Sequence, residues 1–190
     1  MIELETDRLS KLSDNLLKLT SLESENQPFD PKRYRLDKQL RQIILSVEPQ
    51  WSKKDLLLDI DLDEVLIFAD KELLSHVWIN LIRNSIKFTP VKGKIYIRLI
   101  QTPKEAIVRI SDTGIGITHE DQVHLFERFF KADKSRNRTA GGNGLGLSIV
   151  KKIVDMHVGT IDVDSQVGVG TNFTIYLPKK ELNPNKKQGL

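Results

Sequence analysis

The stretch KELLSHVWINLIRNSIKF, residues 71–88, predicts a long helix that ends before Pro90. Asn80, Asn84 and Lys87 are spaced i, i+4 and i+7, so at about 100° per residue they share one narrow stripe of that helix. Two amides and an ammonium group on a largely buried helix are unfavourable unless a polar partner covers them. Apolar residues cover the flank and the far side of the helix: Val77, Trp78, Leu81 and Ile82.

A magnesium-bound triphosphate would be such a partner. Mg²⁺ prefers oxygen ligands, and one side-chain amide oxygen, together with phosphates and waters, can complete its octahedral shell. Lys87 would then offset phosphate charge. A solvated helix face explains the same stripe equally well, and this helix alone does not decide between the two interpretations.

The segment DTGIGI, residues 112–117, follows a strand of alternating hydropathy. The Asp112 carboxylate at the end of that strand can accept a hydrogen bond from an adenine amino group, and it would repel the carbonyl oxygen that guanine carries there. Gly114 and Gly116 allow positive φ and a close approach of the backbone to a base ring. An ordinary strand-to-loop turn is the alternative interpretation.

The segment GGNGLGLS, residues 141–148, precedes a helical pattern that starts near Leu145. Backbone N–H groups at a glycine-rich helix start form an anion site. The glycine spacing does not fit a dinucleotide-binding fingerprint, and a Walker A lysine is absent. A flexible loop that joins a helix is the alternative.

Residues 118–143 join the two glycine segments and have the composition of a lid. Within them, FERFF (126–130) supplies an apolar patch that we expect to be helical, formed by its three phenylalanines. The next residues, KADKSRNR (131–138), are basic and lack apolar anchors. They would be attracted to a triphosphate, or they form a solvated charge run.

The chain divides into four parts. Residues 2–22 predict an amphipathic helix that packs in a bundle, and a polar stretch with two prolines follows it. The heptad pattern of that helix consists of Ile2, Leu9, Leu12, Leu16 and Leu19. We therefore expect a partial bundle domain (1–24), a linker (25–33), a main domain (34–180) and a disordered tail (181–190).

In the main domain, helices fall in runs between runs of strands, which favours an α+β, two-layer sandwich over a doubly wound sheet. The strands ahead of and behind Pro103 alternate in hydropathy and predict a hairpin. The expected helices cover residues 36–47, 71–88 and 145–156, and the first of them is expected to stop at Pro49. The expected strands cover 56–60, 65–68, 95–99, 106–110, 161–163 and 173–177.

Composition excludes several classes of protein. The 190 residues include no cysteine, which rules out disulfides, thiolate metal sites and a cysteine nucleophile. A net charge of +3 does not indicate a nucleic-acid binder. No apolar run approaches the roughly 18–20 residues that cross a bilayer, and the N-terminus lacks the pattern of a signal peptide. We therefore expect a cytoplasmic domain that contacts neither nucleic acid nor membrane.

In this order and at these spacings, the segments resemble the ATP-binding catalytic domain of bacterial sensor histidine kinases, within the GHKL (Bergerat-fold) ATPases. NLIRNSIKF (80–88) matches the N box of that family, DTGIGI its first glycine box, FERFF its F box and GGNGLGLS its second glycine box. GVGTNFTIYLP (168–178) resembles the C-terminal strand signature. The resemblance covers residues 36–178, and the leucine helix ahead of it resembles the second helix of a dimerisation and phosphotransfer bundle.

The resemblance implies a site for ATP and Mg²⁺. Asn84 would be the magnesium ligand and Lys87 a phosphate contact. Arg128 or Lys131 would reach the γ-phosphate, and Asp112 would read the adenine amino group. The remaining candidates would line the base pocket or bind phosphates: Asn80, Gly114, Gly116, Ile117, Phe126, Gly142, Gly144, Leu145, Gly146, Leu147 and Thr171.

Asn80 stands where hydrolytic relatives such as gyrase carry a carboxylate that acts as general base for water. An amide cannot accept that proton, so the resemblance implies slow hydrolysis, with the phosphoryl group kept for transfer. In the family the γ-phosphoryl group passes to a histidine in a His-Glu-x-x-(Thr/Asn)-Pro setting. The phosphohistidine then transfers that group to an aspartate of a response regulator. His76, His119, His124 and His157 do not fit that setting, so we expect the acceptor upstream of Met1.

The resemblance also implies a homodimeric parent protein that is anchored in the membrane. Two alternatives remain open. The first is an anti-sigma-type serine kinase or a hydrolytic GHKL ATPase, against which the bundle-type helix and Asn80 argue. The second is a non-catalytic module that binds nucleotide only to control its partners, and intact Asn84 and Asp112 argue against decay of the site.

We predict that this chain binds ATP but does not label itself when it is incubated with γ-labelled ATP and magnesium, because it lacks an acceptor histidine. Acid-labile, base-stable label on the isolated chain would contradict this prediction. A histidine-bearing bundle supplied in the same reaction is the positive control.

Overall fold

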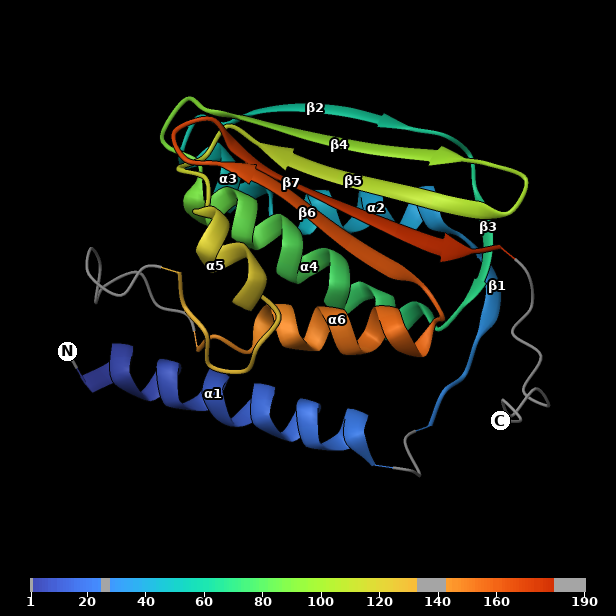
Figure 1. Ribbon diagram of the computed structural model, residues 1–190, viewed down its shortest axis with the longest axis horizontal. Coiled ribbons are helices and arrows are strands. Elements are labelled where there is room, and N and C mark those ends of the chain that lie inside the picture. Colours follow the sequence, from blue (N-terminus) through green and yellow to red (C-terminus); the bar gives the residue numbers. More distant parts are fainter. Residues whose placement is uncertain (1, 25–27, 133–142, 180–190) are drawn as a thin grey trace.

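The computed structural model describes residues 2–24, 28–132 and 143–179 (Figure 1). The expected tail, 181–190, lies outside these ranges. The helices are α1 (Ile2–Glu23), α2 (Leu36–Ser46), α3 (Glu48–Ser52), α4 (Lys71–Phe88), α5 (His119–His124) and α6 (Gly146–Met156). The strands are β1 (Lys32–Arg35), β2 (Leu57–Leu62), β3 (Leu66–Ala69), β4 (Lys94–Gln101), β5 (Glu105–Asp112), β6 (Thr160–Gln166) and β7 (Gly170–Pro178).

Five strands form the main sheet in the order β2-β4-β5-β7-β6. β2 runs parallel to β4, and the other neighbours are antiparallel, including the expected hairpin of β4 and β5. Figure 1 shows α2, α4 and α6 against one face of this sheet, whereas no described helix covers the opposite face. The expected two-layer α+β sandwich is confirmed.

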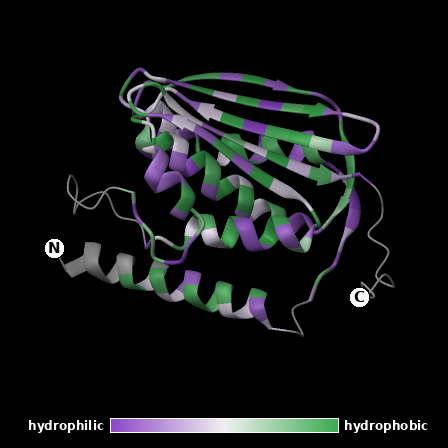
Figure 2. Ribbon diagram, viewed as in Figure 1, coloured by the Kyte–Doolittle hydropathy of each residue, from purple (hydrophilic) through white to green (hydrophobic). Residues whose placement is uncertain are grey.

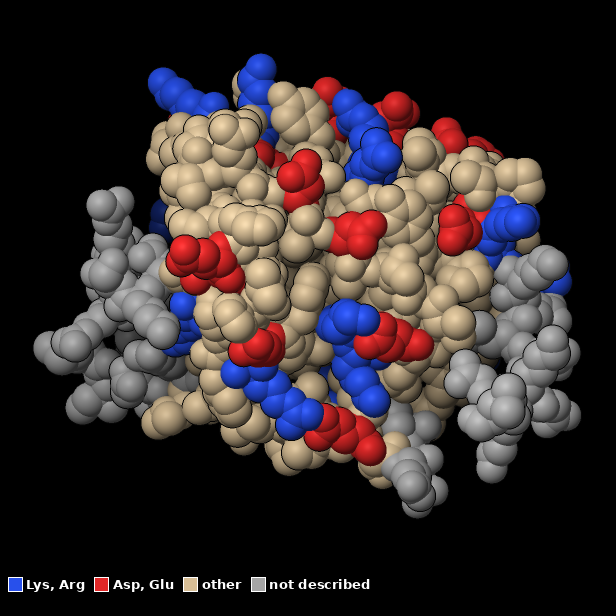
Figure 3. Space-filling model, in the orientation of Figure 1, with Lys and Arg blue, Asp and Glu red and all other residues tan. Residues whose placement is uncertain are grey.

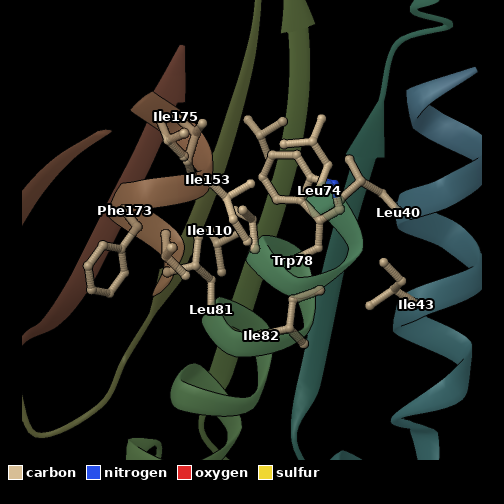
Figure 4. Close-up of a cluster of buried hydrophobic side chains, with 14 of the residues drawn as sticks. Leu40, Ile43, Leu74, Trp78, Leu81, Ile82, Ile110, Ile153, Phe173 and Ile175 are labelled. Carbon is tan, nitrogen blue, oxygen red and sulfur yellow. The ribbon is translucent and has the colours of Figure 1, made fainter. Parts of the chain in front are cut away.

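The apolar core lies between the sheet and α4 (Figure 4). Trp78 and Leu81 of α4 are fully buried, as is Ile110 of β5, and the strands alternate between hydrophobic and hydrophilic residues along their length (Figure 2). Burial of one such side chain contributes about 1.5–3 kcal/mol. The core therefore fixes the rotation of α4, and with it the direction of the polar stripe on the helix.

The sequence pattern missed three short elements, β1, α3 and α5. β1 begins inside the range expected for the linker, because its partner in an antiparallel pair is β3, a segment distant in sequence. α3 contains Pro49, the residue at which the preceding helix was expected to stop. α2 instead ends at Ser46, and Pro49 occupies the first turn of α3, where its missing N–H leaves no hydrogen bond unmade.

α1 packs against α6 with part of its leucine stripe (Figure 1). Leu19 and Leu22 are buried there, whereas Leu9, Leu16 and Leu17 are exposed. α1 therefore retains an apolar stripe beyond its contact with α6. None of the helices in the described ranges combines the length and the apolar character that a membrane-spanning helix needs.

His157, at the end of α6, connects the segment after α1 to the start of α4. Its side chain is 3% exposed; Nδ1 lies 2.8 Å from the Ile153 carbonyl oxygen, and Nε2 lies 3.1 Å from the Asp70 backbone N–H. Asp70 caps α4 by accepting from the Leu73 N–H, and it also accepts from the Asp30 N–H. A neutral imidazole with its proton on Nδ1 satisfies both neighbours of the ring.

Burial holds the pKa of His157 below its ordinary value of 6.5, while its hydrogen bond to Ile153 and the charge of Asp70 act in the opposite direction. The unfolded chain therefore binds a proton more readily than the folded one. We predict a stability contribution that is present above pH 6.5 and lost as the pH falls through the lower folded-state pKa. Urea unfolding at a series of pH values measures it.

His157→Gln, which cannot take up a proton, should reduce this pH dependence. The difference from the wild type separates His157 from His76, whose pKa burial also lowers. Equal pH dependence in the two proteins would contradict the role given to His157.

Candidate functional site

The polar stripe of α4 is present as the sequence predicts. Asn80, Asn84 and Lys87 are half-buried on the helix, whose opposite side carries the buried residues Val77, Trp78, Leu81 and Ile82. Asn80 Nδ2 donates to the His76 carbonyl oxygen at 2.8 Å. Asn80 Oδ1 lies 2.8 Å from the place that a Cβ on Gly146 would take, so glycine at that position lets α6 begin against the stripe.

Two lysines, Lys87 and Lys131, lie near each other at the C-terminal end of this stripe. Burial lowers the pKa of Lys87, and the positive charge of Lys131 lowers it further. Lys87 Nζ lies 4.5 Å from the centroid of the Phe88 ring, and in the described part of the chain no carboxylate forms an ion pair with it. Two neighbouring cations without a carboxylate between them favour a bound anion.

Asp112 ends β5 and is 8% exposed. Burial raises the pKa of its carboxyl group, while the Ser85 hydroxyl and the backbone N–H groups of Gly114 and Thr171 oppose that rise. The Gly114 N–H donates to Asp112 Oδ1 at 2.9 Å. The carboxyl group thus lies in an apolar setting with few partners, where a base amino group would be a strong donor to its anionic form.

Ser85 was missed by sequence reasoning. It lies one residue after Asn84, is 1% exposed and faces the Asp112 carboxyl closely enough to lower its pKa. Its hydroxyl makes no hydrogen bond of regular geometry, and among the described residues it is the buried polar side-chain atom without a partner. A small rotation of the Ser85 hydroxyl would bring its proton to the Asp112 carboxylate, so Ser85 and Asp112 form one buried polar pair.

Two glycines bring separate loops together around Asp112. Gly116 has φ +70°, and a Cβ there would lie 2.0 Å from the Gln166 carbonyl oxygen. Gly170 has φ +142°, and a Cβ there would lie 1.8 Å from the Asp112 carbonyl oxygen. Larger residues would force the loops apart, so both positions require glycine.

Ser165 connects the predicted residues Ile117 and Thr171. Its hydroxyl oxygen accepts from the Ile117 N–H at 2.9 Å and lies 2.9 Å from Thr171 Oγ1. The Gln122 side-chain amide donates to the carbonyl oxygens of both Ile117 and Ser165. The first glycine segment, α5 and the β6–β7 turn therefore form one hydrogen-bonded unit at the end of the sheet.

The second glycine segment is described from Asn143 onward, so Gly142 lies outside the described residues. Gly144 has φ +70°, and its carbonyl oxygen accepts from the Phe129 N–H at 2.8 Å. α6 begins at Gly146 after the buried Leu145, and no side chain caps it. The N–H groups of its first turn, including that of Leu147, have no acceptor within the helix and can bind an anion.

The F box is not helical, contrary to the expectation. α5 ends at His124, and residues 126–130 form turns, in which Phe129 has φ +62° and is 57% exposed. Phe126 packs against the core as expected, whereas Phe130 lies beside the His124 ring. The spacing of the phenylalanines suggested a helix, but the contact between Phe129 and Gly144 imposes a left-handed residue that ends regular structure.

Arg128 and Lys131, the two candidates for the γ-phosphate, lie in different surroundings. Lys131 is near Lys87, whereas Arg128 forms an ion pair with Glu23 of α1. That pair borders a groove of about 510 Å³ between α1, the F box and α6. Charges of both signs are interspersed over α1 and α6 on the face shown in Figure 3. In this conformation Arg128 contacts α1.

The side chains near the α4 stripe suit a magnesium ion that takes most of its ligands from a bound triphosphate. Among the described residues, no group of three histidine or acidic side chains could hold a metal ion by itself. A single amide oxygen from Asn84 fits an ion that takes its other ligands from phosphates and waters. Gly114, Gly116 and Gly170 let the backbone segments around Asp112 approach one another closely. The Asp112 carboxylate that they surround is the kind of acceptor that the amino group of a base requires.

Comparison with known proteins agrees with this geometry. Residues 69–181 match the family described as histidine kinase-, DNA gyrase B-, and HSP90-like ATPase. The circadian input-output histidine kinase CikA of Synechococcus elongatus is 34% identical over 180 residues, which are 93% of this chain and 24% of CikA. Sensor histidine kinase YclK of Bacillus subtilis is 44% identical over 135 residues, which are 70% of this chain and 28% of YclK.

Among solved structures, histidine kinase ThkA in complex with response regulator protein TrrA is 25% identical, with a TM-score of 0.78 over 94% of this chain and 50% of that one. The family match covers more than half of the chain, which therefore belongs to the histidine kinase-, DNA gyrase B- and HSP90-like ATPases. It corresponds to the catalytic ATPase domain of proteins named sensor histidine kinases. The chain spans about a quarter of the length of these two curated relatives.

Gly116 and Gly168 allow a matched test of the close approach between these loops. Their φ angles are similar, +70° and +77°, but a Cβ on Gly168 would meet nothing within 4 Å, whereas one on Gly116 would meet the Gln166 backbone. We predict that Gly168→Ala costs about 1–2 kcal/mol of stability through backbone strain alone. Gly116→Ala should cost about 1–3 kcal/mol more, because the Gln166 backbone must move. Equal unfolding free energies of the two variants in urea would contradict the close approach of these loops.

Proposed function

We propose that this chain binds ATP with Mg²⁺ and is the catalytic part of a histidine kinase. The observation that carries the proposal is the convergence of the α4 stripe, the buried Asp112 and the start of α6, which no side chain caps, at one end of the sandwich. Asp112 accepts from the adenine amino group, Asn84 provides a magnesium ligand, and Lys87 and Lys131 neutralise phosphate charge. The first-turn N–H groups of α6 bind phosphate oxygens.

The transfer reaction depends on position and charge. An imidazole nitrogen of an acceptor outside this sequence attacks the γ-phosphorus, the bond from that phosphorus to the β–γ bridging oxygen breaks, and ADP leaves with the bond electrons. Magnesium, when bound, offsets charge on the phosphate oxygens. Lys87 orients the triphosphate from the helix side, and Lys131 approaches it from the lid side. Because the triphosphate is held in one orientation, the γ-phosphorus and the acceptor imidazole do not have to meet by a random bimolecular encounter.

Asn80 favours transfer over hydrolysis. Its amide faces the start of α6, where water would have to be activated, and it donates to a backbone carbonyl oxygen. An amide cannot remove a proton from water, so attack by water on the γ-phosphorus receives no general-base assistance from this position. The bound triphosphate is therefore retained for an external histidine.

The partners follow from this chemistry. The phosphohistidine passes its phosphoryl group to an aspartate of a response-regulator receiver domain. The solved complex of the similar histidine kinase ThkA with response regulator protein TrrA supports a partner of this kind. The exposed stripe of Leu9, Leu16 and Leu17 on α1 favours association with further bundle helices, in a homodimeric parent protein. We place this chain on the cytoplasmic side of a membrane-anchored parent.

Calorimetric titration with Mg·ATP tests the binding site. Asp112→Ala and Asn84→Ala should each weaken binding by about 10- to 100-fold, the loss expected for a hydrogen bond or ligand contact to a charged group. Asn172→Ala is the matched control, because Asn172 pairs with Ser111 in β5 and β7, away from α4. Unchanged affinity in both site variants would refute the proposed pocket.

Transfer is tested separately, with a histidine-bearing bundle supplied in trans and γ-labelled ATP. Label on the bundle histidine supports the kinase. Label on a serine of a partner protein would favour a serine kinase, and rapid release of free phosphate would favour a hydrolytic ATPase. ATP binding without any of these three outcomes would favour a non-catalytic nucleotide-binding module.

A further inference from the structure

The C-terminal end of α4 has an unusual cap. The last four carbonyl groups of a helix have no partner within it and need donors from elsewhere. In α4 these belong to residues 85–88. The Ser85 carbonyl accepts from Thr89, through both its N–H and its hydroxyl, and the Phe88 carbonyl accepts from the Ile115 N–H at 3.3 Å.

Lys54 satisfies the two that remain. Its ammonium group donates to the carbonyl oxygens of Ile86 at 2.7 Å and Lys87 at 2.9 Å, and also to that of Thr89 at 2.7 Å. These three bonds use all three of its protons. Burial lowers the pKa of Lys54. A positive charge at this place also offsets the negative end of the helix dipole.

The backbone of Lys54 is fixed as well. It lies in the turn between α3 and β2, where its carbonyl oxygen accepts from the Lys92 N–H at 2.9 Å. Leu57 then donates to the Gly93 carbonyl oxygen at 2.9 Å. Figure 1 shows α3 at the same end of the sandwich as the C-terminus of α4. The backbone hydrogen bonds to Lys92 and Gly93 therefore fix the position of the turn that carries Lys54.

The end of α4 also supports the first glycine segment. The Phe88 carbonyl oxygen accepts from Ile115, and it would lie 2.8 Å from a Cβ on Gly114. Gly114 in turn donates to Asp112. A shift of the last turn of α4 would thus move the backbone that surrounds the Asp112 carboxyl group, although Lys54 contacts neither Asp112 nor Gly114.

We propose that Lys54 is a positioning residue for the adenine pocket: by capping α4 it fixes the Phe88 carbonyl, and through it the loop of Gly114 and Ile115 beside Asp112. The inference rests on the proposed function, because it assigns the base to that pocket. Lys54 itself does not touch the nucleotide. Its effect is therefore on recognition of the adenosine part. The long, flexible side chain of Lys87 can keep its phosphate contact when the last turn shifts, whereas the backbone around Asp112 has no such freedom.

The test compares Lys54→Met with Lys53→Met, which removes the same charge from an exposed neighbour in the same turn. Affinities are measured for ADP and for inorganic tripolyphosphate, and hydrogen exchange is measured at the Ile115 amide without nucleotide. Lys54→Met should weaken ADP binding about tenfold, the size of one lost hydrogen bond. It should also speed exchange at Ile115 and leave tripolyphosphate binding unchanged, while Lys53→Met resembles the wild type.

A folded Lys54→Met protein with wild-type ADP affinity and wild-type exchange at Ile115 would overturn the proposal. An equal loss for ADP and tripolyphosphate would also overturn it, because that result indicates a general structural or charge effect. If Lys54→Met does not fold, Lys54→Gln, which keeps two donors, replaces it with the same criteria. Failure of the wild type to bind ADP would refute the proposed function instead, and the exchange measurement would still test the cap.

Discussion

The site depends on one constraint, that α4 buries one side completely and keeps its other side polar. Trp78, Leu74 and Leu81 have no exposed surface, and they lock the helix against the sheet. Rotation by even one residue, about 100°, would carry Asn84 and Lys87 into that core at a large desolvation cost. The core therefore orients the stripe, and the stripe is available for a ligand because the core leaves α4 no other rotation.

The end of the sheet meets this helix at Asp112. β5 and β7 pair through Asp112 and Thr171, and the loops that leave them cross so closely that Gly116 and Gly170 have no room for a side chain. Such contacts leave the carboxyl group buried with few donors around it. A carboxyl group in that setting discriminates between ligands, because a donor on the ligand is strongly favoured there and an acceptor is strongly disfavoured.

Sequence periodicity was sufficient for α4, for the β4–β5 hairpin and for the two-layer architecture, since each is governed by local alternation of apolar and polar residues. The glycine segments and Asp112 became candidates through their order and spacing along the chain, which resemble those of a known family, because each segment by itself also fits an ordinary loop. Lys54, Ser85 and Ser165 were missed, because their roles arise from contacts between distant segments. The F box was expected to be helical, whereas the approach of Phe129 to Gly144 fixes a positive φ that no local pattern reveals.

The central claim is that a purine lies against Asp112 while its phosphates reach the α4 stripe and the start of α6. A crystal structure with magnesium and a non-hydrolysable ATP analogue tests it most directly. The account predicts the adenine amino group within hydrogen-bonding distance of the Asp112 carboxylate, and the metal on the Asn84 side-chain oxygen. An analogue bound elsewhere, such as in the groove between α1 and α6, or bound with its base away from Asp112, would contradict it.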